Sequence, residues 1–312
     1  MSLRVVFMGT PEFAVPGLAA LLDAGCDVVG VVSQPSKPVG RGLQVQAPPV
    51  AAFAASKGLP VHQWPRLSNE SFEVLSGLAP ELCVVIAYGR ILPRRYLDLP
   101  RHGCLNVHAS LLPRWRGAAP IQWAVIDGDA RTGVCVMRMA EGLDTGPVAC
   151  TLETDIGPDE TSGALHDRLA VLGAQALRQT LDALSEGPLT FVDQPETGVT
   201  YARRLEKLDG QLDWTWSARR VHDRVRGTSP WPGAFVDRPE GPLKIHATRV
   251  VDSADTGGAL PGTIVGSAAD GPIIACGTAA VVLSSVQRAG RKVVSGAEFL
   301  RGATDLVPGA RL

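Results

Sequence analysis

The chain has 312 residues, of which 45% are hydrophobic and 20% charged, and its formal net charge is −1. These values fit an ordinary globular protein with room for two domains, and the balanced charge by itself gives no indication of a nucleic-acid partner. The apolar runs are far shorter than the ~20 residues that cross a bilayer, and the first residues lack a signal-peptide pattern. We therefore expect a cytoplasmic protein that does not associate with a membrane.

The first two thirds of the chain alternate apolar strands with helical segments. Strands are predicted at residues 4–8, 27–33, 82–87, 104–108 and 134–139. Helices are predicted at residues 11–24, 48–57, 69–78, 118–127 and 161–185. Continuous apolar strands that alternate with helices are typical of a parallel sheet with helices on both faces. The sequence therefore predicts an α/β fold with a doubly wound, mostly parallel sheet.

The pattern changes after the long helix. Residues 188–208 have the composition of a connector, and from residue 210 onward Gly and Pro separate short strand candidates from one another. These candidates are residues 233–236, 243–251, 262–265, 272–276 and 280–286, with helical patches at 217–226 and 295–302. Short strands with frequent turn signals favour a small barrel or sandwich. We therefore expect two domains, at residues 1–205 and 209–312.

The turn after the first strand contains Gly9, Thr10 and Pro11. Doubly wound folds bind nucleotides at this turn, but the sequence has neither the Gly-x-Gly-x-x-Gly motif nor a P-loop. An NAD- or ATP-dependent enzyme is therefore disfavoured. The six cysteines form no Cys-x-x-Cys pair, so we expect structural thiols in a reducing compartment and no metal site.

The most informative stretch begins Asn106-Val107-His108 and continues to Gly117. If residues 105–108 form a strand, the side chains of Asn106 and His108 point to the same side. An amide and an imidazole that project together can hydrogen-bond a developing oxyanion and handle a proton. Asp144 follows in a glycine-bracketed loop, which would also fit an ordinary turn. The Asn, His and Asp residues together suit transfer of a small acyl group between two bound molecules.

Two loops carry further candidates. Residues 34–42 are rich in Pro and Gly and contain Lys37 and Arg41. This composition fits either a solvated surface loop or a mobile loop that closes on an anionic partner, because a guanidinium suits phosphate recognition. Tyr88 and Gly89 follow the third strand at its carboxyl end, where open parallel sheets bind ligands. They could equally form a plain turn from a strand to a helix.

Several motifs resemble those of the methionyl-tRNA formyltransferase family, and the resemblance covers essentially the whole chain. The Asn-x-His and Leu-Asp-Thr-Gly elements are shared by all folate-dependent formyltransferases. Narrower elements are Gly-Thr-Pro-Glu-Phe-Ala from Gly9, Arg-Trp-Arg-Gly-Ala-Ala-Pro-Ile-Gln from Arg114, and the appended C-terminal region. The resemblance implies a Rossmann-like formyltransferase domain followed by an OB-fold-like barrel that binds tRNA. It implies 10-formyltetrahydrofolate as donor and the amino group of initiator methionyl-tRNA as acceptor, with no metal, and we expect a monomer.

The resemblance also assigns roles to residues. The catalytic residues would be Asn106, His108 and Asp144. The folate-binding residues would be Tyr88, Gly89, Ser110, Leu111, Leu112 and Pro113. The tRNA-binding residues implied for the loop at residues 34–49 would be Lys37 and Arg41. Arg203 and Arg204 are further candidates for tRNA binding from the basic cluster around the domain connection, although a solvated helix face would also explain that cluster. The chain departs from the family at residues 43–46, Leu-Gln-Val-Gln, where lysines often stand, so Lys37 and Arg41 would carry the phosphate contacts of this loop.

Two other functions remain open on sequence grounds. The first is a different enzyme that uses 10-formyltetrahydrofolate, with an amino sugar or water as the acceptor. The second is a catalytically inert RNA-binding module built on the C-terminal barrel, which would bind tRNA but not folate. The Asn106, His108 and Asp144 set argues against the inert module.

Overall fold

The computed structural model describes residues 2–39, 44–252, 256–302 and 307–312. Its contacts group the chain into two compact units. Unit 1 comprises Met1–Gly117, Thr132–Thr154 and His166–Tyr201. Unit 2 comprises Ala118–Arg131, Asp155–Leu165 and Ala202–Leu312.

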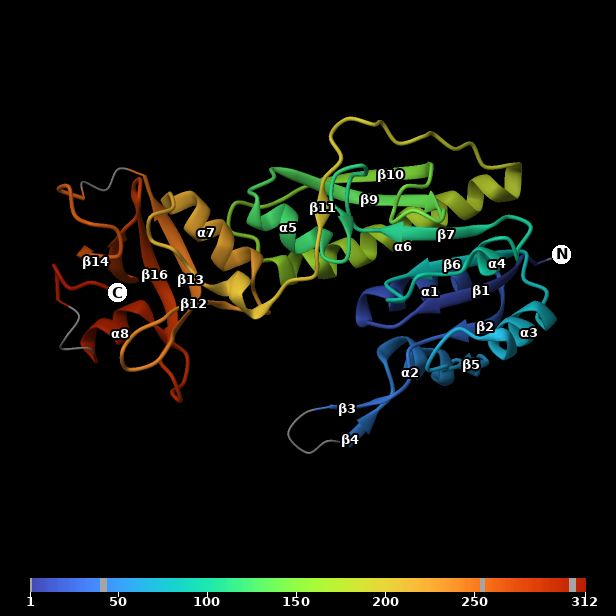
Figure 1. The fold of residues 1–312 in the computed structure, drawn as a ribbon, viewed down its shortest axis with the longest axis horizontal. Coiled ribbons are helices and arrows are strands. Elements are labelled where there is room, and N and C mark those ends of the chain that lie inside the picture. Colours follow the sequence, from blue (N-terminus) through green and yellow to red (C-terminus); the bar gives the residue numbers. More distant parts are fainter. Residues whose placement is uncertain (1, 40–43, 253–255, 303–306) are drawn as a thin grey trace. The chain divides into compact units, whose positions relative to one another are not determined.

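A seven-stranded sheet forms the centre of unit 1 (Figure 1). In spatial order its strands are β10 (Val148–Asp155), β9 (Arg131–Arg138), β7 (Cys104–His108), β6 (Leu82–Ile86), β1 (Arg4–Gly9), β2 (Asp27–Val32) and β5 (Val61–His62). The strands from β7 to β5 pair in parallel, whereas β9 runs antiparallel to β7. The predicted mostly parallel α/β sheet is confirmed, and β10 is a strand that the sequence analysis did not predict.

Helices cover both faces of this sheet. They are α1 (Val15–Asp23), α2 (Pro49–Ser56), α3 (Asn69–Gly77), α4 (Arg94–Leu97) and α6 (Ser162–Glu186). Gly173 of α6 packs against Val107 of β7 and Val134 of β9. Cys104 of β7 instead donates a weak hydrogen bond to the carbonyl of Tyr96 in α4, at 3.4 Å. Because side chains alternate along a strand, Asn106 and His108 share the face of Cys104 and lie opposite α6.

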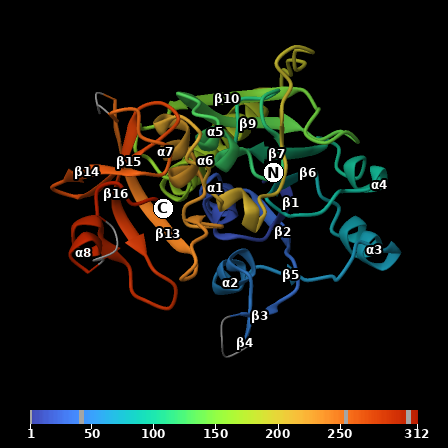
Figure 2. The same ribbon diagram turned by 60° about the vertical axis from the view of Figure 1, so that its left-hand side comes forward.

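Short elements complete unit 1. The strands β3 (Lys37–Val39) and β4 (Gln44–Gln46) pair as an antiparallel hairpin that lies apart from the central sheet (Figures 1 and 2). The other short elements are η1 (Glu12–Ala14), β8 (Arg116–Gly117) and β11 (Tyr201–Ala202). The sequence analysis placed η1 inside its predicted helix at residues 11–24 and expected one short extended piece in the connector, where β11 lies. It did not predict β3, β4 or β8, because two or three residues are too few to show a period.

The described residues of unit 2 form an antiparallel sheet and several short helices. Its strands follow the order β12 (Ala234–Val236), β13 (Leu243–Val251), β16 (Ala280–Gln287), β15 (Gly271–Ala275) and β14 (Ile264–Ala268), and β17 (Val294–Ser295) pairs with β16. Its helices are α5 (Pro120–Ile126), η2 (Lys207–Gly210), α7 (Ala218–Gly227) and α8 (Gly296–Arg301). The buried side chains of Val221 and Val225 on α7 join the apolar core under the sheet, which includes Ile245 and Leu283. The predicted strand-rich C-terminal region is confirmed, while its closure into a barrel stays a prediction.

Within the described ranges, no helix is both long and apolar enough to cross a membrane. The same ranges contain no group of three or more His, Cys, Asp or Glu residues that could hold a metal ion.

Candidate active site

The central part of the candidate site is the carboxyl-terminal half of β7. Asn106 is half-buried between Val85 of β6 and Met137 of β9, its partners in the sheet. His108 lies two residues further along the same face and is buried. The alternation predicted from the sequence therefore places the amide and the imidazole side by side, as expected.

A backbone carbonyl fixes the imidazole of His108. Nε2 of His108 lies 2.9 Å from the carbonyl oxygen of Trp115. A carbonyl can only accept a hydrogen bond, so we assign the hydrogen of the neutral ring to Nε2. The other nitrogen, Nδ1, is then a proton acceptor when the ring is neutral and a donor when it is charged.

Asp144 lies next to that second nitrogen. Its Oδ2 is 3.7 Å from Nδ1 of His108, and the two side chains are 11% and 7% exposed. The same oxygen accepts a hydrogen bond of 2.8 Å from the backbone N–H of Gly117. At 3.7 Å the carboxylate is too far for a direct hydrogen bond to the ring, but it is close enough to act on it electrostatically.

The loop that carries Asp144 has a constrained backbone. Asp144 adopts a positive φ of 53°, a left-handed conformation that Asp tolerates better than most residues. A Cβ atom at Gly146 would overlap the carbonyl of Arg138, so only glycine fits there without a shift of the backbone. These two features turn the Asp144 side chain back toward β7.

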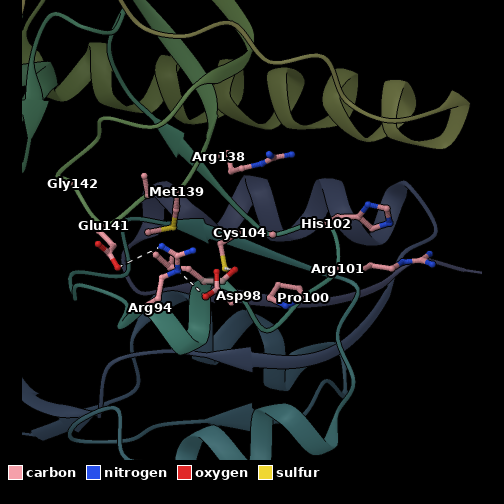
Figure 3. Close-up of a pocket in the computed structure, with 13 residues that line it drawn as sticks. Arg94, Asp98, Pro100, Arg101, His102, Cys104, Arg138, Met139, Glu141 and Gly142 are labelled. Atoms are coloured by element: carbon pink, nitrogen blue, oxygen red, sulfur yellow. Dashed lines mark hydrogen bonds and ion pairs between the residues drawn. The ribbon is translucent and has the colours of Figure 1, made fainter.

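A pocket of about 770 Å³ lies at the start of β7 (Figure 3). Cys104 contributes to its wall and precedes Asn106 by two residues on the same face of β7, a step of ~7 Å. Gly142, on the loop that carries Asp144, also lines the pocket. The apolar side chains of Leu97 and Met139 also line the pocket.

Charged groups line the remainder of the pocket. Arg94 lies between two carboxylates, at 2.7 Å from Asp98 and 3.6 Å from Glu141, as Figure 3 shows. Burial lowers the pKa of His102, and the charge of Arg101 lowers it further. The neutral imidazole is therefore favoured in the folded protein at neutral pH.

The residues predicted to bind folate differ in their burial and hydrogen bonds. The Tyr88 side chain is buried in the apolar core, and its carbonyl accepts a hydrogen bond of 3.1 Å from the side chain of Gln34. Ser110 is fully buried and donates to the carbonyl of Arg114 at 2.7 Å. Residues 111–113 are half-buried, and Gly89 is exposed with a positive φ of 80°. The Tyr88 carbonyl and the Ser110 hydroxyl are therefore already bonded within the protein.

The residues predicted to bind tRNA differ in their surroundings. Lys37 is exposed at the start of the β3–β4 hairpin, and Arg41 lies outside the described residues. Arg203 and Arg204 are both exposed, and Arg203 forms a two-pronged ion pair with Asp209, at 2.5 and 2.8 Å. Burial raises the pKa of Asp209, but the hydrogen bonds from Arg203 and from the Glu206 backbone outweigh it and leave that pKa below its usual value.

The sequence analysis missed several residues of the site. It did not select Leu97, Met139 or Glu141 of the pocket, nor Trp115, whose carbonyl holds His108. One signal was available, because residues 139–143 directly precede Asp144 and had to pass near any site that contains it. No periodic pattern marks a residue that contributes only a carbonyl.

An amide, an imidazole and a carboxylate gather near the carboxyl end of a central strand in a doubly wound sheet. This arrangement defines an enzyme of the group-transfer class, which stabilises a developing oxyanion and moves a proton. The chain belongs to the formyl transferase family. Residues 3–181 match the formyl transferase domain, and residues 204–304 match the formyl transferase C-terminal domain.

Curated relatives extend over the full length of the chain. A methionyl-tRNA formyltransferase of Myxococcus xanthus is 50% identical over 309 residues, which cover 99% of this chain and 97% of that protein. A methionyl-tRNA formyltransferase of a Methylobacterium species is 50% identical over 315 residues and is covered completely, as is this chain.

Solved structures with low sequence identity share the fold. An N-formyltransferase from Helicobacter canadensis, in complex with folinic acid and dTDP-3-aminofucose, is 14% identical with a TM-score of 0.68. That match covers 91% of this chain and 99% of the other. HypX from Aquifex aeolicus, in complex with tetrahydrofolic acid, is 13% identical with a TM-score of 0.61, and the match covers 96% of this chain but 47% of HypX.

Proposed function

We propose that this chain transfers the formyl group of 10-formyltetrahydrofolate to the α-amino group of initiator methionyl-tRNA. The observation that carries the proposal is the 50% identity, over the whole chain, to curated methionyl-tRNA formyltransferases. The grouping of Asn106, His108 and Asp144 supports it, because formyl transfer to an amine needs an oxyanion donor and a proton acceptor.

The acceptor amine needs little activation. A free α-amine has a pKa of roughly 7.7–8.0, and an adjacent ester lowers it, so much of it is neutral near pH 7. Positioning and stabilisation of charge therefore matter more than generating the nucleophile. When bound, 10-formyltetrahydrofolate supplies the electrophilic formyl carbon.

Asn106, His108 and Asp144 each have a separate role in the transfer. Asn106 donates a hydrogen bond to the oxygen that becomes negative. The bond from the amine nitrogen to the formyl carbon forms as the bond from that carbon to N10 of the folate breaks. At Nδ1, His108 takes up the proton that the amine loses, because its Nε2 is bound by the Trp115 carbonyl, and releases it to N10. Asp144, with its Oδ2 at 3.7 Å, stabilises the charged form of the ring and can accept a proton from the amine through water.

The pocket at the start of β7 is the best candidate for the folate ring system. Its apolar lining by Leu97 and Met139 suits a flat heterocycle, and the carboxylates of Asp98 and Glu141 can accept hydrogen bonds from ring N–H groups. Cys104 of its lining shares the face of β7 that carries Asn106, one ~7 Å step away. The predicted segments at Gly89 and at residues 111–113 would then contact other parts of the folate.

We propose that residues 1–205 form the catalytic domain and that residues 209–312 bind tRNA together with the connector. Lys37 and Arg204 are exposed and can approach phosphates. Arg203 is less suited to this role, because Asp209 already occupies its guanidinium. Arg41 stays a prediction from the resemblance.

The decisive experiment mixes the purified protein with 10-formyltetrahydrofolate and methionyl initiator tRNA and measures formyl-methionyl ester by mass spectrometry after tRNA hydrolysis. We expect formylation that depends on both substrates. A dTDP-amino sugar and a reaction without acceptor serve as controls. Formylation of the sugar alone, or release of formate with no transfer to tRNA, would replace the proposal with the sugar or hydrolase alternative.

A further inference from the structure

We propose that Gln194 is a positioning residue that holds the Asp144 carboxylate in place for catalysis. This proposal rests on the proposed function, because it assigns Gln194 an effect on the rate of formyl transfer. Gln194 lies on the segment that connects α6 to β11 in unit 1 (Figure 1).

The side-chain amide of Gln194 makes four hydrogen bonds. Its Nε2 donates to the carbonyls of Asp144 and Gly146, each at 2.8 Å. Its Oε1 accepts from Nε and Nη2 of Arg116, at 3.0 and 2.7 Å. Carbonyls only accept and a guanidinium only donates, so these partners fix which end of the amide faces which side.

The same segment is attached to unit 1 at further points. Val192 exchanges two backbone hydrogen bonds with Val148, at 2.8 and 2.9 Å. The ring of Phe191 lies 4.0 Å from the guanidinium of Arg138. Gln194 therefore projects from a segment that is already fixed beside β9 and β10. Its two hydrogen bonds to the Asp144 loop hold that loop against the fixed segment.

The segment also holds the acceptor of His108. The side-chain oxygen of Thr200 accepts a 2.8 Å hydrogen bond from the backbone N–H of Trp115, and the Thr200 carbonyl accepts one of 2.9 Å from Arg116. The carbonyl of Trp115 binds Nε2 of His108. Residues 191–200 thus contact both the Asp144 loop and the turn residue Trp115, whose carbonyl orients the imidazole.

The Asp144 loop needs such support. Asp144 has a positive φ, which costs free energy for any residue other than glycine, and its flanking residues Leu143 and Thr145 are exposed. The two bonds from Gln194 bracket the strained residue, at Asp144 itself and at Gly146. Gln194 reaches no reacting atom in this arrangement, so its effect must pass through Asp144.

The test compares two isosteric variants. In Gln194→Glu the oxygen toward Arg116 is kept, while the NH2 group that donates to the two carbonyls becomes an oxygen that repels them. Gln179→Glu makes the same charge change at an exposed position of α6, where the side chain is bonded only by the Cys150 thiol among the contacts recorded for the described residues. Both variants are assayed with 10-formyltetrahydrofolate and methionyl initiator tRNA.

We expect Gln194→Glu to lower kcat 10- to 100-fold, with KM for both substrates within threefold of wild type. Gln179→Glu should match wild type. In an Asp144→Asn background, Gln194→Glu should cause less than a threefold further loss, because the carboxylate that it positions is gone. Full multiplication of the two losses, a change confined to KM, or an unchanged kcat would each overturn the proposal.

Hydrogen–deuterium exchange separates this proposal from the proposed function. We expect faster exchange at residues 140–146 in Gln194→Glu than in Gln179→Glu, whether or not the protein formylates tRNA. If wild type fails to formylate tRNA, the proposed function falls and, with it, the catalytic role of Gln194. Unchanged exchange in an active enzyme would overturn the role of Gln194 alone.

Discussion

The charge of Asp144 gives the sharpest prediction about catalysis. Asp144→Asn keeps the size of the side chain and an oxygen that can accept from Gly117, but it removes the negative charge 3.7 Å from Nδ1 of His108. Coulomb's law at that separation gives about 1 kcal/mol at the dielectric constant of water and about 4.5 kcal/mol at an effective value near 20. Both side chains are nearly buried, so the larger value is the better guide.

The smaller energy corresponds to a fall in kcat of roughly 5-fold and the larger to one of roughly 2,000-fold, because each 1.36 kcal/mol changes a rate tenfold. We expect the loss in kcat in a single-turnover formylation assay at saturating tRNA, with an unchanged melting temperature. Asp167→Asn is the matched control, since it neutralises an exposed carboxylate 2.9 Å from the ring of His166, outside the site. An Asp144→Asn enzyme within threefold of wild type would refute the electrostatic reasoning.

Three further predictions concern other parts of the chain. Gly146→Ala should lower both the melting temperature and kcat, because its Cβ would overlap the carbonyl of Arg138. Arg204→Ala should weaken tRNA binding in a filter-binding assay and lower the salt dependence of binding by about one phosphate contact. Arg203→Ala should weaken tRNA binding less, because Asp209 holds that guanidinium. Burial raises the pKa of Cys276 to about 12. Its thiol should therefore resist alkylation at pH 8.5 until the protein unfolds. The stability that the buried neutral thiol contributes should be complete below about pH 8.5 and be lost as the pH rises toward 12.

Each of these has a clear contrary outcome. A Gly146→Ala enzyme as stable and active as wild type would mean that the loop can move away from Arg138. Equal losses of tRNA binding in the two arginine variants would mean that the ion pair with Asp209 does not keep Arg203 from binding tRNA. A stability difference between wild type and Cys276→Ala that does not change between pH 7 and pH 10, measured by urea unfolding, would contradict the burial argument.

The sequence predicted the main strands well because each is a short, continuous apolar run. The run around Val134 reads the same in either direction, however, so the antiparallel direction of β9 could not be predicted. The shared face of Asn106 and His108 followed from alternation along a strand. The approach of Asp144 to His108 depended on the family resemblance, since no local pattern relates a loop residue to a strand earlier in the chain.

No local sequence pattern could have predicted the role of Gln194. Its partners lie 50 and 78 residues earlier in the chain, at Asp144 and Arg116, and the segment around it has no hydrophobic period. The pocket was missed for a related reason. It forms where residues after β6 meet the loop after β9, and sequence alone does not say which loops meet.

The reversed direction of β9 has a consequence for how the enzyme family can vary. Arg138 pairs with Leu105, three strand positions before His108, so the loop that leaves β9 must recover a length of ~10 Å to bring its acid to the ring. From Gly146, which is seated on Arg138, two residues at full extension span only ~7 Å, and the side chains of Asp144 and His108 must bridge the remainder. The spacing has no spare length: deleting one residue there would leave every functional group in the sequence and still separate the Asp144 carboxylate from the His108 ring.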